Sequence, residues 1–506
     1  MSYGSSHMSS NVTNCVAVID IGKTNKKVAV YDADLQQVAF REEEFAAAPG
    51  ADGILHEPVA AMWDWFKRQL SELYRQQPFA AIAVSTHGAT VAAIDADGAL
   101  ALPVVAYDNP LDDQAQHDLD RRFYEICGDP AALQGETATC DLPLLINPAK
   151  ALLFYRQHYP EGLGRCRHLL NYPQYWGFLL TGQRAAEPTY TANHSFLFAI
   201  RERRPSSAAH ALGAAALLDL PLRRPWDNLG TLTPALQEEL ALPALPVAVG
   251  IHDSNAALLP YLVSQADDDF VLNSTGTWCV AMHRVDEVVY SPDELGQKVI
   301  FNIDALGGYQ KVSFLMGGQE YGCYHNLIGG DHITFDAAGV DRILADPGDM
   351  VLPGAFPSQF PRVNGGILEN GVVHELAELQ AGYRPAWFAD QRCAHMRLNV
   401  SLALQTKVAL ERTGIGPQTP VFIEGGFRQN ETYRHVLAAL MPERTVACTE
   451  LSQAAASGAA LLALALADGR DPRDYAAVCQ IAKAPVTPPD LPHLAAYAEA
   501  FYSRVL

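Results

Sequence analysis

One stretch near the start of the chain decides the fold: Val16-Ala17-Val18-Ile19-Asp20-Ile21-Gly22-Lys23-Thr24-Asn25-Lys26-Lys27-Val28-Ala29-Val30. An apolar run ends at an acidic residue, a glycine and small polar residues follow, and a second apolar run begins. The pattern predicts a β-hairpin whose polar turn carries an Asp carboxylate beside backbone N–H groups. Amides and hydroxyls bind phosphate oxygens, a Lys supplies positive charge, and the Asp can hold Mg2+ through water. The turn is therefore a candidate phosphate and metal site, with an ordinary polar hairpin turn as the alternative.

Composition narrows the class of protein. The chain has 506 residues, of which 49% are hydrophobic and 18% are charged, as in a globular protein of several domains. Its formal net charge of −21 argues against nucleic acid or an anionic membrane as a partner, because basic surfaces bind those partners. The sequence has no apolar run of about 18 residues or more, so no membrane span is expected. Nine cysteines without CxxC pairs favour a reducing compartment, and we expect a cytoplasmic protein.

The pattern of strands and helices divides the chain into two halves. A strand–turn–strand unit opens each half, the second over residues 270–283. Long helices are expected over 57–76 and 391–413, and a mainly helical region over 149–181. Residues 338–369 are rich in Gly and Pro and are expected to form a loop-heavy insert. We predict an N-terminal domain over 11–255 and a C-terminal domain over 256–506, with a ligand cleft between them and a cloning remnant over 1–10.

Three further segments carry residues suited to phosphate chemistry. In the first, a buried strand runs into His252 and Asp253, where a rigid carboxylate could take a proton from a hydroxyl, or Asp253 could simply cap the following helix. In the second, Asn273-Ser274-Thr275-Gly276-Thr277, amides and hydroxyls could cradle phosphate or merely turn a hairpin. The third, Glu424-Gly425-Gly426-Phe427-Arg428-Gln429-Asn430, allows close backbone approach before a helix N-terminus, or is a tight strand-to-helix turn.

The order and spacing of these segments resemble the FGGY family of carbohydrate kinases, within the actin-like ATPase superfamily of folds. The first turn is similar to the family form Asp-x-Gly-Thr-Thr-x-x-Lys/Arg, with Lys23 in place of the usual Thr. The family's Gly-Gly-x-x-x-Asn segment and its Gly-Ala-Ala-Leu-Leu-Ala helix stand here at residues 425–430 and 458–463. The resemblance covers the chain from about Asn14. It implies an α/β fold of two actin-like ATPase (ribonuclease H-like) domains, whose mixed sheets flank a central cleft.

The resemblance also implies an activity and its site residues. Mg-ATP would lie between the domains, and Asp253 would be the general base that deprotonates a sugar hydroxyl for attack on the γ-phosphate. Asp20 and Asp253 would lie near the metal ion. The nucleotide would be bound by Asp20, Gly22, Lys23, Thr24, Asn25, Lys27, Thr275, Gly276, Thr277, Gly425, Gly426 and Asn430. The sugar would be bound by His87, Gly88, Asp108, Asn109, His252 and Asp253.

The identity of the sugar is left open by conflicting signals. The segment 86–90, Thr-His-Gly-Ala-Thr, is similar to xylulose kinases, whereas residues 252–253 and 274–278 are more similar to rhamnulose and fuculose kinases. Either Asp108 or Asn109 could hold the acidic position on the sugar side. We expect a ketose or deoxyketose of the xylulose, ribulose, rhamnulose or fuculose type, with a polyol or a signalling carbohydrate as the alternative. Trp176 and Trp278 are candidate sugar platforms, although a lone Trp is more often part of a core.

Two other classes of function stay open. An actin- or chaperone-like ATPase without a sugar acceptor would use the same fold, and a sugar-binding regulator would have lost catalysis. The sugar-side segments argue against the ATPase, and the presence of Asp20 and Asp253 argues against the regulator. The expected partners are a small-molecule sugar and ATP, with neither nucleic acid nor membrane, and a homodimer is left open.

Overall fold

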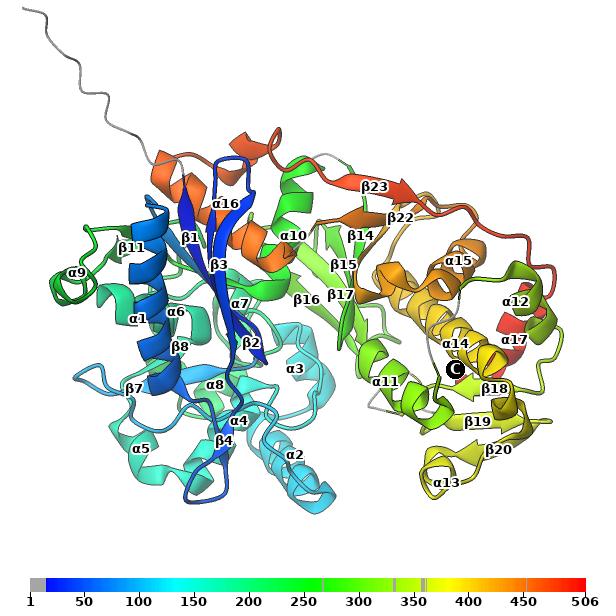
Figure 1. Cartoon of the computed structure of the whole chain (residues 1–506). Helices are drawn as coiled ribbons and strands as arrows, with labels where there is room; N and C mark the ends of the chain where they lie inside the picture. Colours follow the sequence, from blue (N-terminus) through cyan, green and yellow to red (C-terminus); the bar gives the residue numbers. More distant parts are fainter. Residues whose placement is uncertain (1–14, 266–267, 331–333, 356–359, 361, 452) are drawn as a thin grey trace, which may run out of the picture.

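The computed structural model describes residues 15–265, 268–330, 334–355, 360, 362–451 and 453–506, so the expected cloning remnant at 1–10 lies outside the described residues. The chain forms two lobes, each built on a mixed β-sheet with helices on its faces (Figure 1). The prediction of two α/β domains with mixed sheets is therefore confirmed.

The first sheet grows from the hairpin at the start of the sequence. In spatial order its strands are β11 (Asn228–Thr231), β12 (Pro246–Ala248), β6 (Ile82–Thr86), β1 (Val16–Ile21), β2 (Asn25–Tyr31) and β3 (Gln37–Glu44), with β13 (Ile251–His252) also paired to β6. β1 is antiparallel to β2 and parallel to β6, and β13 is parallel to β6. Because β1 and β13 flank β6, residues that follow these two strands meet at one edge of the sheet.

Both faces of the first sheet are buried, because alternate residues of β1 point into different layers. Ala17 and Ile19 belong to the layer of α1 (Val59–Gln76), α6 (Tyr172–Thr181) and α9 (Pro234–Leu240). Val16 and Val18 belong to the layer of α10 (Asp253–Ser264) and α16 (Ala454–Asp468). A strand covered on both faces explains the almost continuous apolar run in the sequence.

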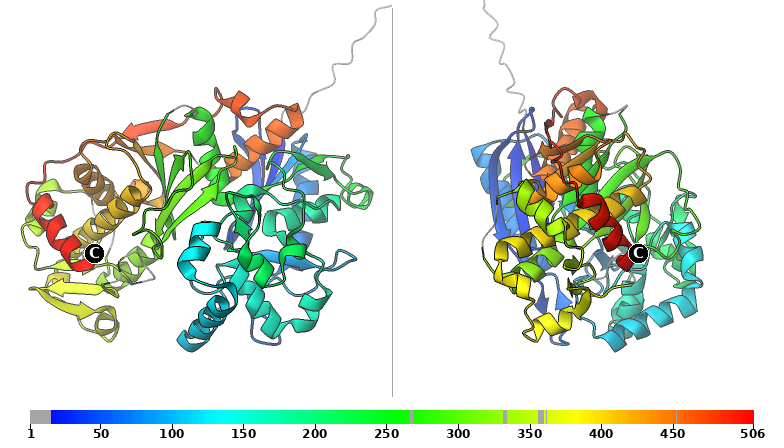
Figure 2. Two further views of the ribbon diagram at one scale, coloured as in Figure 1. Left: turned by 180° about the vertical axis from the view of Figure 1, so that it is seen from behind. Right: turned by 90° about the vertical axis from the view of Figure 1, so that its right-hand side faces the viewer.

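α16 stands late in the chain but packs on the first sheet, beside the blue strands in Figures 1 and 2. It crosses α10 so closely that a Cβ on Gly458 would lie 1.8 Å from the carbonyl oxygen of Ala256. Only a glycine permits this approach. α10 uses its other side, with Leu258 and Leu262, to pack against the second sheet, and so it lies between the two sheets.

The second sheet repeats the plan of the first. Its strands, in spatial order, are β16 (Val299–Ile303), β17 (Tyr309–Leu315), β15 (Cys279–Val285), β14 (Val271–Thr275), β21 (Val421–Gly425), β22 (Val446–Glu450) and β23 (Ala482–Pro485). β14 is antiparallel to β15 and parallel to β21, as β1 is to β2 and β6. Its outer face carries α11 (Gly317–Ile328), α12 (Ala337–Leu344), α14 (Gln391–Arg412), α15 (Glu431–Leu440) and α17 (Leu494–Val505).

Smaller elements decorate both lobes. The helices are α2 (Asp113–Cys127), α3 (Pro130–Thr137), α4 (Pro148–His158), α5 (Pro160–Arg165), α7 (Pro188–Thr191), α8 (Ser207–Ala211) and α13 (Leu376–Gln380). The strands are β4 (Ala48–Pro49), β5 (Leu55–His56), β7 (Val91–Ile94), β8 (His168–Asn171), β9 (Phe198–Ala199), β10 (Arg204–Pro205), β18 (Met350–Leu352), β19 (Gly366–Glu369) and β20 (Val372–Glu375).

Two local predictions were incomplete. The region 149–181 is mainly helical, as predicted, but a short strand that was not predicted, β8, pairs with β7 between α5 and α6. Within 338–369, the described residues include most of α12 and two strands, β18 and β19, which pair with each other. Short strands such as these depend on partners outside the local window, which local periodicity does not reveal.

Candidate active site

Two carboxylates meet at the carboxyl ends of neighbouring strands in the first sheet. Asp20 lies near the end of β1, in register with Ser85 of β6. On the other side of β6, β13 leads directly into Asp253, the first residue of α10. Desolvation, and then the like charge of Asp253, raise the pKa of Asp20 to about 7, while Lys27 opposes that shift. Two carboxylates that repel each other in this way suit a bound cation.

Asp253 is held rigidly at the start of α10. Its Oδ1 accepts a hydrogen bond from the backbone N–H of Ser254 at 2.6 Å. The N-cap position of the helix belongs to His252, so Asp253 does not fill the capping position that was the alternative interpretation. Desolvation raises the pKa of Asp253, with His87 acting in the opposite direction. A carboxylate with a raised pKa is a stronger base than one in water.

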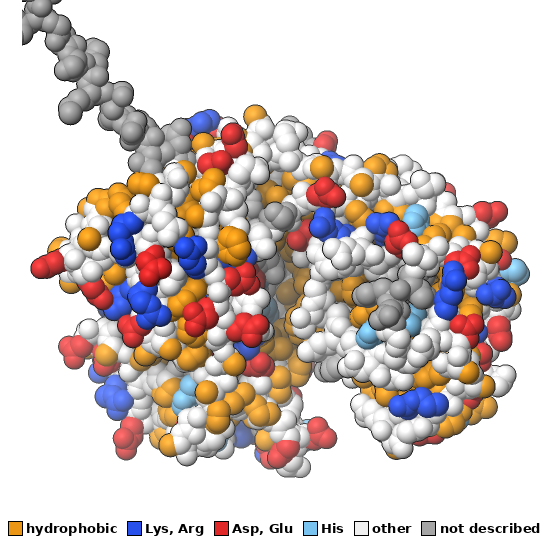
Figure 3. Space-filling view, in the orientation of Figure 1, with side chains coloured by type: hydrophobic (Ala, Val, Ile, Leu, Met, Phe, Trp, Pro, Cys, Tyr) orange, Lys and Arg blue, Asp and Glu red, His pale blue; other side chains and the backbone are white. Residues whose placement is uncertain are grey.

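A cavity of about 200 Å³ lies between the two lobes at this point. Figure 3 shows the surface hollowed between the lobes. The first lobe contributes mainly polar residues to the cavity wall, among them His87, Gly88, Tyr107, Asn193, His194, His252 and Asp253. The second lobe contributes mainly apolar ones, among them Trp278, Val280, Met282, Val312 and Phe314. One polar and one apolar wall match a sugar, which presents hydroxyls at its edge and C–H groups on its face.

Neutral imidazoles form part of the polar wall. Burial lowers the pKa of His252 to about 3 and, together with the proximity of His252, lowers that of His194 to about 3. The side-chain amide of Asn193 donates to Nε2 of His252 at 2.9 Å, which leaves the ring proton on Nδ1. No described residue accepts from that Nδ1. That Nδ1 is itself buried, so this N–H lies within the wall and not on the surface of the cavity.

Gly88 lies between these imidazoles. A Cβ at this position would lie 2.6 Å from Nε2 of His252 and 2.8 Å from Nε2 of His194. Next to it, His87 packs against Tyr107 and Tyr172, with ring centroids 5.5 and 5.3 Å apart. Burial lowers the pKa of His87. The predicted sugar residues His87, Gly88, His252 and Asp253 thus all line one cavity.

The other two predicted sugar residues, Asp108 and Asn109, have different environments. Asn109 is buried, and its side chain accepts from the backbone N–H of Leu55 and donates to the carbonyl of Pro110. Asp108 is exposed and pairs with the ammonium of Lys23 at 2.7 Å. Of the two candidates for the acidic position, only Asp108 keeps its side chain free of such backbone bonds among the described contacts.

The first turn contains three lysines whose side chains make different contacts. The Lys26 side chain is fully buried and donates to the carbonyls of Lys23 and Phe45 at 2.7 and 3.1 Å, which braces the turn from within. The Lys27 ammonium contacts the side-chain oxygen of Gln453, at the start of α16, and lies 3.5 Å from a carboxylate oxygen of Glu42. Thr24 and Asn25 are exposed at the tip, where they are accessible to a ligand.

Lys23 lies on the side of the turn that faces Asp108, one of the predicted sugar residues. Its ammonium is 2.8 Å from Oε1 of Glu57 as well as 2.7 Å from Oδ1 of Asp108. The sequence analysis missed Glu57, because nothing in its local pattern distinguishes it from a surface residue preceding a helix. Its side chain is fully buried, and its Oε2 has no hydrogen-bond partner among the described residues.

The second turn is held by close backbone packing. Gly425 has φ +83°, and a Cβ there would lie 2.0 Å from the carbonyl oxygen of Thr275. The Thr275 hydroxyl donates to the carbonyl of Glu424 and accepts from the backbone N–H of Phe427. Gly276 and Thr277 are exposed at the tip of the hairpin. The two predicted nucleotide segments around 275 and 425 are thus in direct contact.

A second cavity, of about 390 Å³, adjoins the paired glycines. Asn430 caps α15 by accepting from the backbone N–H of Tyr433, and its amide donates to Asn399 of α14 at 2.7 Å. Gly426 follows Gly425 into a 3₁₀ turn over Gly426–Gln429. The cavity is lined by Tyr321, His395, Asn399, Gly426, Phe427, Gln429, Asn430 and Glu431, and its aromatic and amide groups suit a heterocyclic base.

The two tryptophans that are candidate sugar platforms also have different environments. Trp176 is fully buried in the core of the first lobe, where it packs edge-on against Phe66. Trp278 lines the cavity between the lobes and packs against Phe314, with ring centroids 5.5 Å apart. Only Trp278 is therefore placed to meet a ligand in that cavity.

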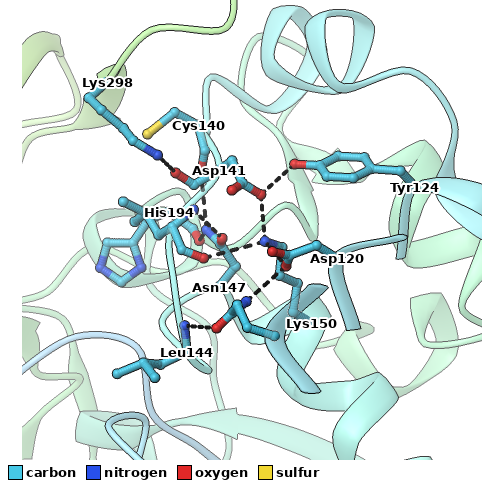
Figure 4. A network of polar contacts seen from close by, with 11 residues as sticks. Asp120, Tyr124, Cys140, Asp141, Leu144, Asn147, Lys150, His194 and Lys298 are labelled. Carbon is cyan, nitrogen blue, oxygen red and sulfur yellow. Dashed lines mark hydrogen bonds and ion pairs between the residues drawn. The ribbon is translucent and has the colours of Figure 1, made fainter. Parts of the chain in front are cut away.

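Behind the cavity, a polar network joins the two lobes (Figure 4). The fully buried Lys150 pairs with Asp120 and Asp141 at 2.6 and 2.5 Å. Lys298, just before β16 in the second lobe, donates to the backbone carbonyl of Asp141. A buried ammonium needs such partners, because an unpaired one is costly.

Asn147 extends the same network to the cavity wall. Its amide donates to the carbonyl of His194 at 2.8 Å, and its side-chain oxygen accepts from the backbone N–H of Leu142 at 2.9 Å. His194 and Leu142 both line the cavity. The network therefore fixes the shape of the wall.

Both halves of the chain match domains of one family. Residues 15–260 match the N-terminal domain of the FGGY family of carbohydrate kinases, and residues 267–472 match the FGGY C-terminal domain. The chain belongs to the FGGY family of carbohydrate kinases. The resemblance predicted from the sequence is thereby confirmed.

Individual FGGY relatives are distant. A rhamnulokinase from Oceanobacillus iheyensis is 26% identical over 119 residues, which make up 24% of this chain and 25% of the relative. The chain thus matches about a quarter of that relative's length. A solved carbohydrate kinase from Novosphingobium aromaticivorans is 27% identical, with a TM-score of 0.77 over 97% of this chain and 98% of that one. A Plasmodium falciparum glycerol kinase solved with ADP is 14% identical, with a TM-score of 0.77 over 98% of each chain, and shares the fold.

Proposed function

We propose that this FGGY chain transfers the γ-phosphoryl group of ATP to a hydroxyl of a ketose or deoxyketose, with Asp253 as the general base. The observation that carries the proposal is the placement of Asp253. It lies on the wall of a sugar-sized cavity between the lobes, and it interacts with Asp20 of the phosphate-type turn. No other arrangement in the described part of the chain combines a cavity, a base and such a turn.

The transfer follows from this arrangement. Asp253 accepts the proton of the acceptor hydroxyl, the oxygen attacks the γ-phosphorus, and the bond to the bridging oxygen of ADP breaks. The raised pKa of Asp253 strengthens the base, and its rigid place at the start of α10 aligns it. Little covalent work is required of the protein, because positioning and charge neutralisation supply much of the rate in phosphoryl transfer.

The donor sites fit Mg-ATP. The cavity beside Gly426 and Asn430 suits the base, and the exposed tips at Thr24 and Thr277 suit the phosphates. Mg2+ would neutralise charge on the phosphates, held near Asp20 and Asp253 through water. The described ranges contain no group of three or more His, Cys, Asp or Glu side chains that could hold a metal ion.

An uncharged polyhydroxy acceptor fits the wall chemistry. His194 and His252 stay neutral, and Tyr107, Asn193 and Asp253 add polar groups to the same wall. The hydroxyls of a ketose or deoxyketose match such groups. The rhamnulokinase relative supports a deoxyketose, whereas the fold shared with a glycerol kinase keeps a polyol as the second candidate.

Regarding location, none of the helices in the described ranges is long and apolar enough to cross a membrane.

An ADP-release assay with Mg-ATP tests the proposal. The panel contains xylulose, ribulose, rhamnulose, fuculose and glycerol, and each acceptor is compared with a sample that has none. Release that depends on one or two ketoses supports the proposal, and release that depends on glycerol alone favours the polyol. Equal release with and without every acceptor would instead indicate an ATPase.

A further inference from the structure

Lys23 occupies a bridging position that the proposed function leaves unexplained. It belongs to the turn between β1 and β2, but its ammonium pairs with Glu57 and Asp108. It also lies 4.9 Å from the ring centroid of Tyr107, a residue of the cavity wall. The side chain thus reaches from the phosphate-type turn toward the acceptor cavity.

The hydrogen bonds of this cluster are incomplete. An ammonium carries three N–H donors; Lys23 donates one to Glu57, and its charge also pairs with Asp108 at 2.7 Å. The Lys23 side chain is 25% exposed and the Asp108 side chain 44% exposed, so both can meet a ligand. Glu57 is fully buried, and its Oε2 has no partner among the described residues. Its Oε1 holds the ammonium of Lys23 in place.

The charges of the cluster also bear on which acceptors can bind beside it. Lys23 and the buried Lys26 balance the carboxylates of Glu57 and Asp108, so the net negative charge that faces the cavity is that of Asp253 on its wall. A carboxylate on the acceptor would be repelled, whereas a hydroxyl could accept from Lys23 and donate to Asp108.

We propose that Lys23 is a specificity-determining residue for the acceptor: it holds Asp108 beside the cavity and donates its remaining N–H to an acceptor hydroxyl other than the reacting one. The pair thereby selects uncharged polyhydroxy acceptors over carboxylated ones. This inference rests on the proposed kinase function and deepens it.

The test measures acceptor binding and nucleotide use separately. The best acceptor of the ketose panel is titrated calorimetrically without nucleotide, and KM for Mg-ATP is measured at saturating acceptor. Lys23→Met is expected to weaken acceptor binding about tenfold or more, the loss of a charge-assisted hydrogen bond, with KM for Mg-ATP changed by less than about twofold. Lys23→Arg, which keeps the charge, is expected to recover most of the binding.

A matched control is available in the same lobe. Lys67 also pairs with two carboxylates, Asp64 at 3.3 Å and Glu239 at 2.8 Å, and lies near Trp63, but it is not among the residues that line the cavity. Lys67→Met is expected to change neither quantity. Because Lys23→Met leaves Glu57 buried without its partner, the double variant Lys23→Met/Glu57→Gln provides a second form that removes both charges.

Specificity is tested with gluconate as the carboxylated comparator. Asp108→Asn is expected to raise the ratio of kcat/KM for gluconate to that for the ketose several-fold. A raised KM for Mg-ATP with unchanged acceptor binding would assign Lys23 to the nucleotide and overturn the inference, as would variants that match the wild type. If the wild-type chain itself phosphorylates no acceptor, the proposed function fails as well.

Discussion

The two sheets begin with the same unit, but their turns are held in different ways. In the first lobe, buried and paired lysines fix the turn that follows Asp20, and a Cβ on Gly22 would meet only the carbonyl oxygen of Asn25, at 3.1 Å. In the second lobe, the backbone at Gly425 presses on Thr275 with no room for a Cβ. One topology therefore serves a turn fixed by ion pairs in one lobe and a turn fixed by close backbone packing in the other.

This difference between the two turns predicts which property a substitution in each of them should change. Changes on the charged side are expected to alter chemistry and acceptor binding, because ionised groups act there directly. Changes on the close-packed side are expected to alter stability and nucleotide binding, because geometry is what that side supplies.

Asp253→Asn carries the largest expected effect. The amide keeps the shape of the side chain but cannot accept the proton, so kcat is expected to fall about 10²–10⁴-fold. Acceptor binding, measured by calorimetry without nucleotide, is expected to survive largely intact. Asp227→Asn, on a loop of the same lobe, serves as the control. Equal losses of kcat and acceptor binding would contradict the assignment of Asp253 as the base.

Gly425→Ala is expected to damage the second turn far more than Gly426→Ala. The alanine at 425 would need φ +83° and a Cβ 2.0 Å from the carbonyl oxygen of Thr275, whereas at 426 that oxygen is 3.9 Å away. The free energy of unfolding should fall by at least ~2 kcal/mol for the first variant and change little for the second. Denaturant titration of both variants measures this. Similar stabilities would show that the turn relaxes, and would weaken the contrast between the lobes.

His194→Asn tests the neutral imidazoles of the acceptor wall. The pKa of His194 is about 3 in the folded chain and ordinary when unfolded, so between those values the unfolded chain binds more protons. The contribution of the neutral His194 to the free energy of unfolding is therefore fully present above about pH 6.5. It is lost progressively as the pH falls below that value. Asn does not titrate and tolerates φ +38°, so the slope of unfolding free energy against pH should shrink by up to about 1.4 kcal/mol per pH unit.

The control for that slope is His210→Asn, an exposed histidine of the same lobe. Denaturant titrations at several pH values below neutrality give the slopes. An unchanged slope in His194→Asn would show that the ring is accessible to protons in the folded chain.

Asn430→Ala is expected to have the smallest effect. It removes the cap of α15 and the bond to Asn399, which should cost about 1 kcal/mol of stability and raise KM for Mg-ATP. Asp112→Ala removes the cap of α2 and should cost a similar amount without changing KM for Mg-ATP. A KM that stays unchanged in Asn430→Ala as well would separate this residue from the nucleotide.

Local sequence patterns predicted the elements but not the contacts between them. The apolar runs of β1 and β2 and the helical spacing of α1 were sufficient to locate those elements, and the buried strand before Asp253 placed that residue at a sheet edge. The direction of Lys23 could not be predicted, because it depends on Glu57, 34 residues away, and on a loop still more distant. The nucleotide and metal roles of the predicted residues stay predictions.

The packing of α16 has a consequence for how the protein is made. Val16, Val18 and Ala29 emerge from the ribosome early, yet the helix that covers them begins only at Ala454. Until then α10 alone can cover part of that apolar face, and the rest is a surface that attracts chaperones or other nascent chains. The first lobe therefore cannot finish folding during its own synthesis, and a chain that stops before α16 should be recovered mainly as aggregate.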